Sequence, residues 1–310
     1  MTKRNYGSGA IILVTGASGF LGMKLVKRLA DDGNEVIAVT RKIPNSSSAL
    51  SDKVKWIELD LSNAIHKLGS LPKLDAVVHL AGNKGGLGND SMALFRDNEV
   101  SLINLLHEIA HKTELVVFAS TQMVYGNIKS LTVSEEFSLR PQDSDYGCSK
   151  VNSENWLRNF QRAKGGCYIS LRFCGFVDGG GFVDYVINQT LVNGPIQLLN
   201  RGRSIRDYLL SGDGIEALVS AIRFSGAEGF LPINIGSACT LSALDIANLV
   251  VDVTNSKSRI ELIDRPAPKE DFLFDIKLAN KVLNFHPTTL ENSIRVYTES
   301  RITKSKESRN

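Results

Sequence analysis

Tyr146 and Lys150 stand four residues apart in a segment whose periodicity predicts a helix over 146–163. Both side chains should therefore lie on one face of that helix. A lysine ammonium beside a phenol stabilises the phenolate and lowers a tyrosine pKa that is normally about 10. Such a pair can exchange a proton with an alcohol or ketone while a nicotinamide exchanges hydride. The same spacing is common on solvated helices, so its meaning depends on the surroundings.

A pair of hydroxyl residues, Ser120 and Thr121, comes where a buried strand predicted at 115–120 ends. Ligands of a parallel sheet bind beyond the carboxyl ends of its strands. We therefore expect a serine or threonine hydroxyl at this place to bond the reacting oxygen and to hold it near Tyr146. Ser120 can equally serve as a cap of the strand end.

Glycines at positions 16, 19 and 22 separate an apolar run at 11–15 from an amphipathic segment. This pattern predicts a strand that turns into a helix, whose free N–H groups and dipole can hold a pyrophosphate. Gly16 permits the tight turn, Gly19 lets phosphate approach the backbone, and Gly22 lets helix and strand pack closely.

Apolar runs alternate with helical segments along the first two thirds of the chain. Further strands are predicted at 35–40, 54–59, 75–80 and 168–173, and a further helix at 91–112. This alternation predicts an α/β fold, a doubly wound parallel sheet of the Rossmann type.

After residue 173 the pattern changes, and we expect a smaller, discontinuous α/β cap domain that binds substrate. The expected cap elements are a helix at 182–193, a strand at 196–199 and two helical stretches within 239–297, whereas a helix at 212–224 and a strand at 232–236 are expected to return to the sheet. We assign 1–172 and 204–238 to the dinucleotide-binding domain, 173–203 and 239–298 to the cap, and 299–310 to a flexible tail.

Composition narrows the class of protein. A net charge of +3 over 310 residues is too small to indicate nucleic-acid binding. The four cysteines are scattered without CxxC spacing, so we expect neither disulfides nor a metal site. No apolar run reaches membrane-spanning length, so we expect no membrane contact and a cytoplasmic protein.

Taken together, these motifs resemble the extended short-chain dehydrogenase/reductases, in the branch of NAD(P)-dependent nucleotide-sugar epimerases, dehydratases and reductases. The resemblance covers roughly residues 10–290. It implies catalytic roles for Thr121, Tyr146 and Lys150, a nucleotide-diphosphate sugar as substrate, and a homodimer. The cofactor contacts that it implies are Gly16, Ser18, Gly19, Phe20, Leu21, Gly22, Asp60, Leu61, Leu80, Ala81, Gly82, Lys84, Asn98 and Lys150.

The resemblance also implies substrate contacts from Ser120, Gln122, Arg206 and Arg265. The two arginines match positions that bind the nucleotide diphosphate, and a guanidinium offers a planar fork for phosphate oxygens. The alternatives are an ion pair of Arg206 with Asp207 or Asp213, and a merely solvated Arg265.

Three departures from the family pattern refine the prediction. Gly175 stands where the family commonly has an asparagine, so one substrate contact is missing or supplied elsewhere. Gln122 and Met123 stand where dehydratases carry acidic residues, so we expect no 4,6-dehydratase activity. Arg41 follows the second strand, where an acidic residue would bind the ribose of NAD, so we expect NADP(H) to be preferred, with NAD(H) as the alternative.

The sequence thus predicts a nucleotide-sugar 4-ketoreductase. A 4-epimerase similar to UDP-glucose 4-epimerase, with retained NAD, is the alternative reaction. A non-catalytic cofactor-binding member of the same family is the alternative from another class, although such members usually lose the tyrosine or the lysine.

Overall fold

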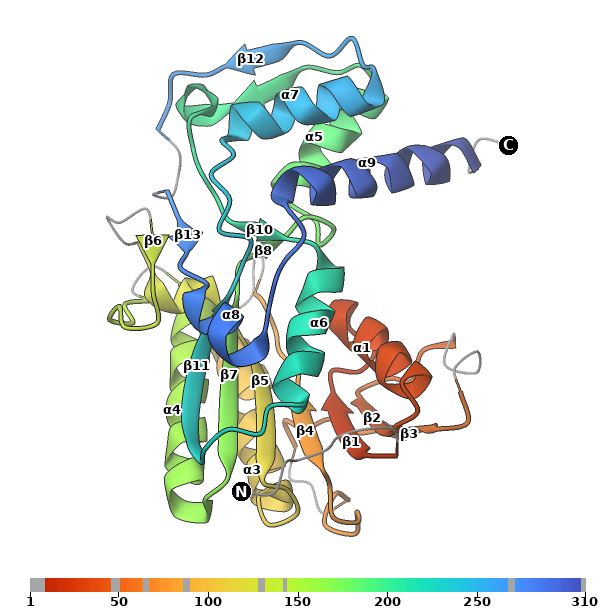
Figure 1. Cartoon of the computed structure of the whole chain (residues 1–310), viewed down its shortest axis with the longest axis vertical. Coiled ribbons are helices and arrows are strands. Elements are labelled where there is room, and N and C mark those ends of the chain that lie inside the picture. Colours follow the sequence, from red (N-terminus) through yellow and green to blue (C-terminus); the bar gives the residue numbers. More distant parts are fainter. Residues whose placement is uncertain are drawn as a thin grey trace.

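The computed structural model describes residues 9–45, 51–63, 67–85, 90–127, 132–141, 144–266 and 271–307. A large sheet forms the lower body in Figure 1, and helices and short strands form a cap above it. The strands of the large sheet are β1 (Ile11–Thr15), β2 (Glu35–Thr40), β3 (Val54–Glu58), β4 (Ala76–His79), β5 (Leu115–Thr121), β7 (Cys167–Phe173) and β11 (Gly229–Ile235).

The shorter strands form three two-stranded pairs. They are β6 (Thr132–Val133) with β13 (Leu273–Phe274), β8 (Gly175–Phe176) with β10 (Tyr208–Leu209), and β9 (Ile196–Leu198) with β12 (Ile260–Leu262). The helices are α1 (Phe20–Asp31), α2 (Ser91–Leu94), η2 (Phe95–Val100), α3 (Ser101–Ile109), η3 (Gln122–Tyr125), α4 (Asp145–Lys164), α5 (Phe182–Leu191), η4 (Leu199–Gly202), α6 (Ser211–Ile222), α7 (Ala243–Thr254), α8 (Lys277–Leu283) and α9 (Leu290–Glu307).

The large sheet has the strand order β11-β7-β5-β4-β1-β2-β3, and every neighbouring pair is parallel. From β1 the chain builds outward through β2 and β3, then crosses over to β4 on the other side of β1. The two directions of winding meet between β1 and β4, which is where a doubly wound sheet binds its ligand. The predicted fold class is confirmed.

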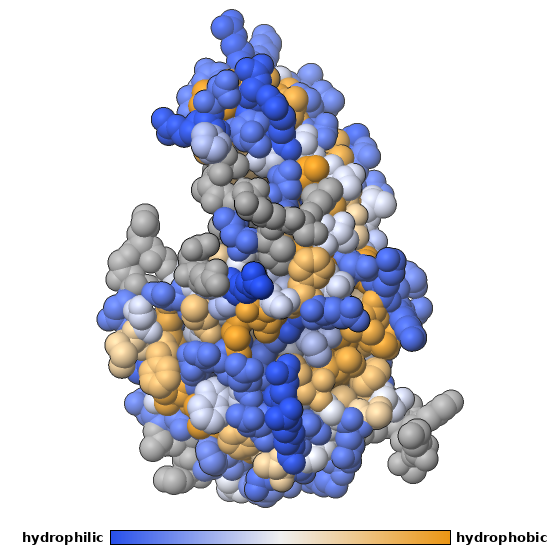
Figure 2. All heavy atoms as spheres, turned by 90° about the vertical axis from the view of Figure 1, so that its left-hand side faces the viewer, coloured by the Kyte–Doolittle hydropathy of each residue, from blue (hydrophilic) through white to orange (hydrophobic). Residues whose placement is uncertain are grey.

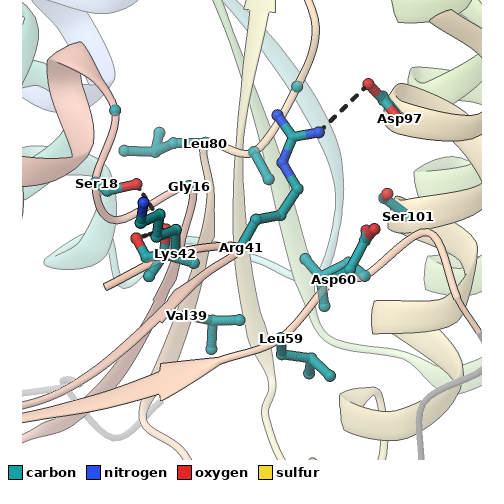
Figure 3. A pocket seen from close by; sticks show the side chains of 15 residues that line it. Gly16, Ser18, Val39, Arg41, Lys42, Leu59, Asp60, Leu80, Asp97 and Ser101 are labelled. Atoms are coloured by element: carbon teal, nitrogen blue, oxygen red, sulfur yellow. Dashed lines mark hydrogen bonds and ion pairs between the residues drawn. The ribbon is translucent and has the colours of Figure 1, made fainter. Parts of the chain in front are cut away.

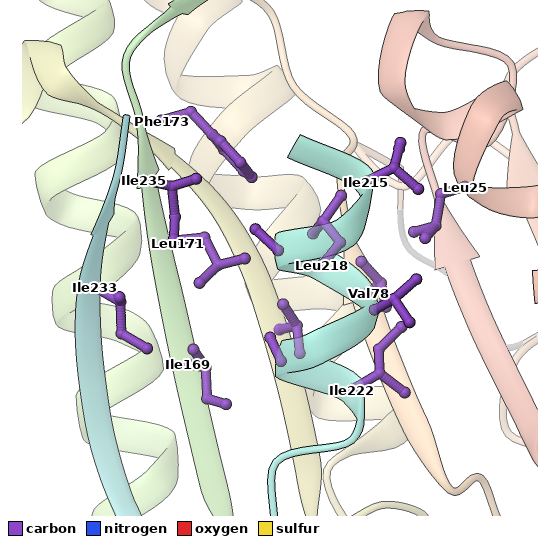
Figure 4. Close-up of a cluster of buried hydrophobic side chains, with 14 of the residues drawn as sticks. Leu25, Val78, Ile169, Leu171, Phe173, Ile215, Leu218, Ile222, Ile233 and Ile235 are labelled. Carbon is purple, nitrogen blue, oxygen red and sulfur yellow. The ribbon is translucent and has the colours of Figure 1, made fainter. Parts of the chain in front are cut away.

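Alternate residues of the strands enter two separate hydrophobic cores, because successive side chains point to opposite faces of a sheet. On β1, Ile12 and Val14 belong to one core and Leu13 to the other. Helices α1 and α6 cover the first face, and α3 and α4 cover the second. Figure 4 shows Leu218 of α6 and Leu171 of β7, which both belong to the first core. Burial of each such leucine stabilises the fold by about 1.5–3 kcal/mol.

The cap has a core of its own, built from α5, α7, α9 and β9. Helix α9 corrects the predicted flexible tail, because it continues to Glu307. Its Arg301 donates to Asp184 of α5, and to the Asn188 side chain at 2.7 Å. A polar segment is therefore held as a helix by contacts with a distant part of the chain. Residues 308–310 of the predicted tail lie outside the described residues.

Two further predictions differ in detail. The segment predicted as one helix at 91–112 consists of α2, the π-helical turn η2, and α3. The part of 239–297 that the structure describes contains α7, α8 and the beginning of α9 rather than two helices. Across the described residues, no helix is both long and apolar enough to cross a membrane. Figure 2 shows hydrophilic residues over most of the cap and patches of hydrophobic residues on the body below.

Candidate active site

The loop between β1 and α1 lies at the switch point of the sheet and needs its glycines. Gly16 has a φ of +64°, and a Cβ atom on it would lie 2.6 Å from the backbone nitrogen of Ala81. A Cβ atom on Gly22 would overlap the carbonyl oxygen of Gly16. Gly19 is the N-cap of α1 and brings no side chain to the helix end. The first N–H groups of α1 are thus approachable by a phosphate.

One cavity, of about 360 Å³, opens from this loop toward β2 and β3 (Figure 3). The predicted cofactor residues that line it are Gly16, Ser18, Gly19, Arg41, Asp60, Leu61, Leu80, Ala81 and Gly82. We call it the β2-side cavity. Arg41 extends across it, with Nη1 3.7 Å from Oδ2 of Asp97 in η2. On the loop side the hydroxyls of Ser18 and Thr40 are 2.6 Å apart.

Asp60 forms the acidic side of the β2-side cavity. Burial alone would raise its pKa, but the backbone N–H and the hydroxyl of Ser62 both donate to Oδ1 and lower it, with help from the charge of Arg41. The carboxylate therefore stays ionised at neutral pH and can accept hydrogen bonds from a ligand.

A second cavity, of about 390 Å³, shares Gly16, Gly19, Leu80 and Gly82 with the first and leads to the ends of β5 and β7. We call it the catalytic cavity. The other predicted site residues that line it are Phe20, Leu21, Gly22, Lys84, Ser120, Thr121, Gln122, Tyr146 and Lys150. Residues from four distant segments of the sequence are thus brought together at one edge of the sheet.

Tyr146 and Lys150 both point from α4 toward the end of β5. The Tyr146 hydroxyl bonds with Thr121, and the ammonium of Lys150 donates to the carbonyl oxygen of Ala119 at 2.9 Å. Burial raises the pKa of Tyr146 to about 12, against the effect of the Thr121 bond. Burial also lowers the pKa of Lys150 to about 8. The predicted net lowering of the tyrosine pKa is wrong here, because burial outweighs the hydrogen bond from Thr121.

The two other polar residues at the end of β5 differ from each other. The side-chain oxygen of Gln122 is buried beside the cavity without a hydrogen-bond partner among the described residues. An unpaired buried carbonyl is costly, so it is available for a ligand donor. The Ser120 hydroxyl instead donates to Glu154 at 2.7 Å.

Asn98, predicted as a cofactor contact, lies behind the cavity wall. Its side chain accepts from the backbone nitrogen of Asn83 at 2.6 Å and donates to the Asn83 carbonyl and to Ser149. The π-helical turn η2 carries it, and such turns are frequent at functional sites. A Cβ atom on Gly82 would lie 3.2 Å from the Asn98 oxygen. Asn98 thus fixes the segment that both cavities share.

A third cavity, of about 350 Å³, lies in the cap and is lined mostly by apolar and aromatic residues, with Arg206 at its wall. Nη1 of Arg206 donates to the carbonyl of Ile205 and lies 3.8 Å from Oδ1 of Asp271. The sequence left open an ion pair of Arg206 with Asp207 or Asp213, whereas the acid that lies near its Nη1 atom is Asp271. Arg265 is exposed and lines none of these three cavities, and its carbonyl accepts from the Asn200 backbone at 2.7 Å.

Gly175 lines the catalytic cavity and lies against a residue of the cap cavity. A Cβ atom on it would lie 3.0 Å from Cδ1 of Tyr208, whose ring lines the cap cavity. The ring fills the space that an asparagine side chain would need, which accounts for this departure from the family pattern.

The prediction from sequence missed several lining residues. In the β2-side cavity they include Thr40, Lys42, Asp97 and Ser101, and in the catalytic cavity Phe173, Cys174, Phe176, Gly179 and Gly180. Most of them follow the ends of β2 and β7, so the rule that ligands bind beyond the carboxyl ends of strands would have found them. Asp97 and Ser101 do not follow a strand, so this rule would not have found them.

Comparisons with known proteins agree with this geometry. Residues 12–236 match the family model described as "NAD dependent epimerase/dehydratase family". An uncharacterised UDP-glucose epimerase of Bacillus subtilis is 29% identical over 299 residues, which cover 90% of this chain and 93% of the relative. A dTDP-4-dehydro-6-deoxyglucose reductase of Escherichia coli is 27% identical over 302 residues, with the same coverage. Among solved structures, a UDP-glucuronic acid 4-epimerase from Bacillus cereus in complex with NAD is 26% identical, with a TM-score of 0.79 over 94% of this chain and 99% of that chain.

Proposed function

This chain belongs to the NAD dependent epimerase/dehydratase family, and from that membership we propose that it is an NADP(H)-dependent reductase of a nucleotide-activated 4-keto-6-deoxy sugar. The observation that carries the proposal is the group of Thr121, Tyr146 and Lys150 in a cavity that continues into the glycine loop. That group suits proton exchange at a carbonyl oxygen, and the cradle of Gly16 and Gly22 fits a dinucleotide pyrophosphate.

A bound nicotinamide cofactor would supply the hydride for the sugar carbon. The protein supplies the proton and the orientation. Tyr146, whose pKa is raised to about 12, is protonated at working pH and donates its proton to the carbonyl oxygen as that oxygen gains charge. Thr121 donates a second hydrogen bond to the same oxygen. The Lys150 ammonium stabilises the phenolate that remains until a proton is taken up from solvent.

NADP(H) is preferred in this proposal because of the charges that follow β2. Thr40 ends the strand, and Arg41 and Lys42 come next and line the β2-side cavity beside Ser18. Two cations and two hydroxyls fit a phosphate on the adenosine ribose. Asp60 and Asp97 lie on the other side of the cavity and offer acceptors for unphosphorylated ribose, so NAD(H) is the alternative cofactor.

The substrate is proposed to extend from the catalytic cavity into the cap cavity, with its diphosphate on Arg206. Cap-cavity aromatics such as Phe182 and Tyr208 can cover a nucleobase. Two similar solved structures are complexes with UDP-glucose and NAD and with UDP-glucuronic acid and NAD, which supports a nucleotide sugar. Arg265 stays a proposed second phosphate contact, carried by the family resemblance alone.

A 4-epimerase with retained NAD is the second candidate. It is favoured by the epimerase names among relatives and structural neighbours, whereas the E. coli relative is a reductase. The same Tyr146 would then exchange its proton in both directions.

We also propose a homodimer formed through α2, η2 and α4. Met92, Phe95 and Trp156 of these helices are exposed by 69%, 44% and 39%, although each is a large apolar side chain. Sedimentation velocity of the intact protein tests this proposal. A dimer is expected, and a monomer at micromolar concentration contradicts it.

Thermal shift assays give the first test of the proposed function, because a tight ligand raises apparent stability by mass action. The protein is tested with NADP(H) or NAD(H), each in combination with UDP, dTDP, GDP or CDP. We expect NADP(H) and one nucleotide diphosphate each to raise Tm. No shift with any cofactor would contradict the reductase, the epimerase and the non-catalytic cofactor-binding member alike.

A further inference from the structure

A third side chain of α4 reaches the end of β5 beside the catalytic pair. Glu154 follows Lys150 by four residues, and it is 1% exposed. Residues 146, 150 and 154 therefore share one helix face. Each of three consecutive residues at the end of β5 is held by one residue of this face. The pairs are Lys150 with Ala119, Glu154 with Ser120, and Tyr146 with Thr121.

Glu154 is itself held firmly. Its Oε1 accepts from Nε of Arg172 at 3.0 Å, and its Oε2 accepts from Nη2 at 2.6 Å. The remaining guanidinium nitrogen, Nη1, donates to the hydroxyl of Tyr125 at 2.8 Å. Tyr125 is the last residue of η3, which begins directly after Thr121. The buried network thus holds the chain on both sides of Thr121, through Ser120 before it and through η3 after it.

The same carboxylate also determines the charge around Lys150. Lys84, in the segment after β4, disfavours a second cation there. His79, at the end of β4, has its pKa lowered to about 3 by burial and by Lys150, so it is neutral. Tyr146 on α4 is neutral as well. The negative charge of Glu154 opposes the lowering of the Lys150 pKa by burial. The same carboxylate also forms an ion pair with Arg172 of β7.

We propose that Glu154 is a positioning residue of the active site, which fixes the Thr121 hydroxyl opposite Tyr146 through Ser120 and Arg172 and places a negative charge one helical turn from the Lys150 ammonium. The inference deepens the proposed function and rests on it wherever turnover is measured. The first test therefore does not depend on measuring turnover.

That test compares the wild-type protein with Glu154→Gln, which keeps the shape and an oxygen acceptor but removes the charge. Competitive labelling with acetic anhydride across pH, read by peptide mass spectrometry, gives the titration of Lys150. We expect its midpoint to fall by about one unit or more in the variant. Lys164, exposed at the end of α4, is the internal control, and the extent of its labelling should be the same in the two proteins. An unchanged midpoint for Lys150 overturns the electrostatic part of the proposal.

A matched pair of serines tests the positioning part. Ser120 and Ser170 donate to the same Oε1 atom, at 2.7 and 2.9 Å, but Ser120 adjoins Thr121 whereas Ser170 lies inside β7. We expect Ser120→Ala to lower kcat by at least about fivefold at unchanged KM, since one hydrogen bond is lost. Ser170→Ala should retain both values.

Equal kcat losses in the two serine variants would mean that the network is merely structural and would overturn the positioning role. A raised KM with unchanged kcat in Ser120→Ala would make Ser120 a direct substrate contact and overturn that role as well. If the wild-type protein turns over no nucleotide sugar, the proposed function fails, and the labelling experiment alone decides the inference about Glu154.

Discussion

Arg41 and Asp97 face each other across the β2-side cavity, with Nη1 and Oδ2 3.7 Å apart. Arg41 is 70% exposed on its side chain, so this pair contributes little to stability in water. The guanidinium is therefore free to exchange the carboxylate for a ligand phosphate, which is a stronger bidentate partner.

From this relationship we predict that Arg41→Ala weakens NADPH binding selectively. The loss of a charge-assisted contact should cost about 1–3 kcal/mol, and NADH affinity should change little. Isothermal titration with both cofactors measures the effect. Arg295→Ala, which removes an exposed arginine of a surface pair on α9, is the matched control. Tighter binding of NADH than NADPH by the wild-type protein would refute the cofactor preference.

The strands of the large sheet were predictable where a run of apolar residues marks a buried segment. The apolar runs at 11–15 and 35–40 match β1 and β2, because strands of a sheet covered on both faces are nearly continuous in hydrophobic residues. The π-helical turn η2 was not predictable, since Asn98 within it bonds to Asn83 in a distant segment. The helical tail depends in the same way on Arg301 and Asp184.

In the candidate site, too, the local motifs were predictable and the contacts between distant segments were not. The family resemblance, together with the glycine spacing at 16–22, implied most of the residues that line the two adjoining cavities, because backbone geometry at strand ends determines their place. The pKa of Tyr146 was not predictable, since it depends on how deeply the ring is buried. Neither was the role of Tyr208 against Gly175, which depends on packing between segments far apart in the sequence.

Replacing the catalytic tyrosine gives the second prediction. Tyr146→Phe removes the proton donor and keeps the ring, so turnover should fall by at least about 10²-fold. NADPH affinity should be nearly unchanged, as measured by fluorescence titration. Near-normal turnover in this variant would mean that another residue is the acid.

The pH dependence of turnover is the third prediction. Burial lowers the pKa of Lys150 to about 8, whereas that of Tyr146 is raised to about 12. Lys150 is cationic below its pKa, so kcat should be highest on the acid side of about 8. It should fall as pH rises through that value and Lys150 loses its charge. A kcat that keeps rising to pH 10 would exclude a required lysine cation.

The substrate arginines give the fourth prediction. Arg206→Ala and Arg265→Ala should each raise KM for the nucleotide sugar, because each guanidinium is expected to bind the diphosphate. Nucleotide diphosphates without sugar should inhibit competitively. If free sugars inhibited as well as nucleotide sugars, the substrate class would be wrong.

The fifth prediction concerns elimination of water. Gln122 and Met123 follow Thr121, and neither an amide nor a thioether can protonate a leaving hydroxyl or remove a C5 proton at working pH. The protein should therefore give no 4-keto-6-deoxy product from dTDP-glucose, GDP-mannose or UDP-N-acetylglucosamine. Mass spectrometry would detect the loss of one water, and such a loss from any of the three contradicts the prediction.

The most direct test of the central proposal follows deuterium from the cofactor to the sugar. The protein is incubated with NADPH deuterated at the nicotinamide C4 position and with dTDP-, UDP-, GDP- and CDP-4-keto-6-deoxy sugars. We predict stoichiometric NADPH oxidation and one deuterium at the sugar C4 for at least one of them, and no turnover in Tyr146→Phe. Interconversion of UDP-glucose and UDP-galactose without net cofactor oxidation, together with no reduction of any keto sugar, would contradict it and establish the epimerase instead.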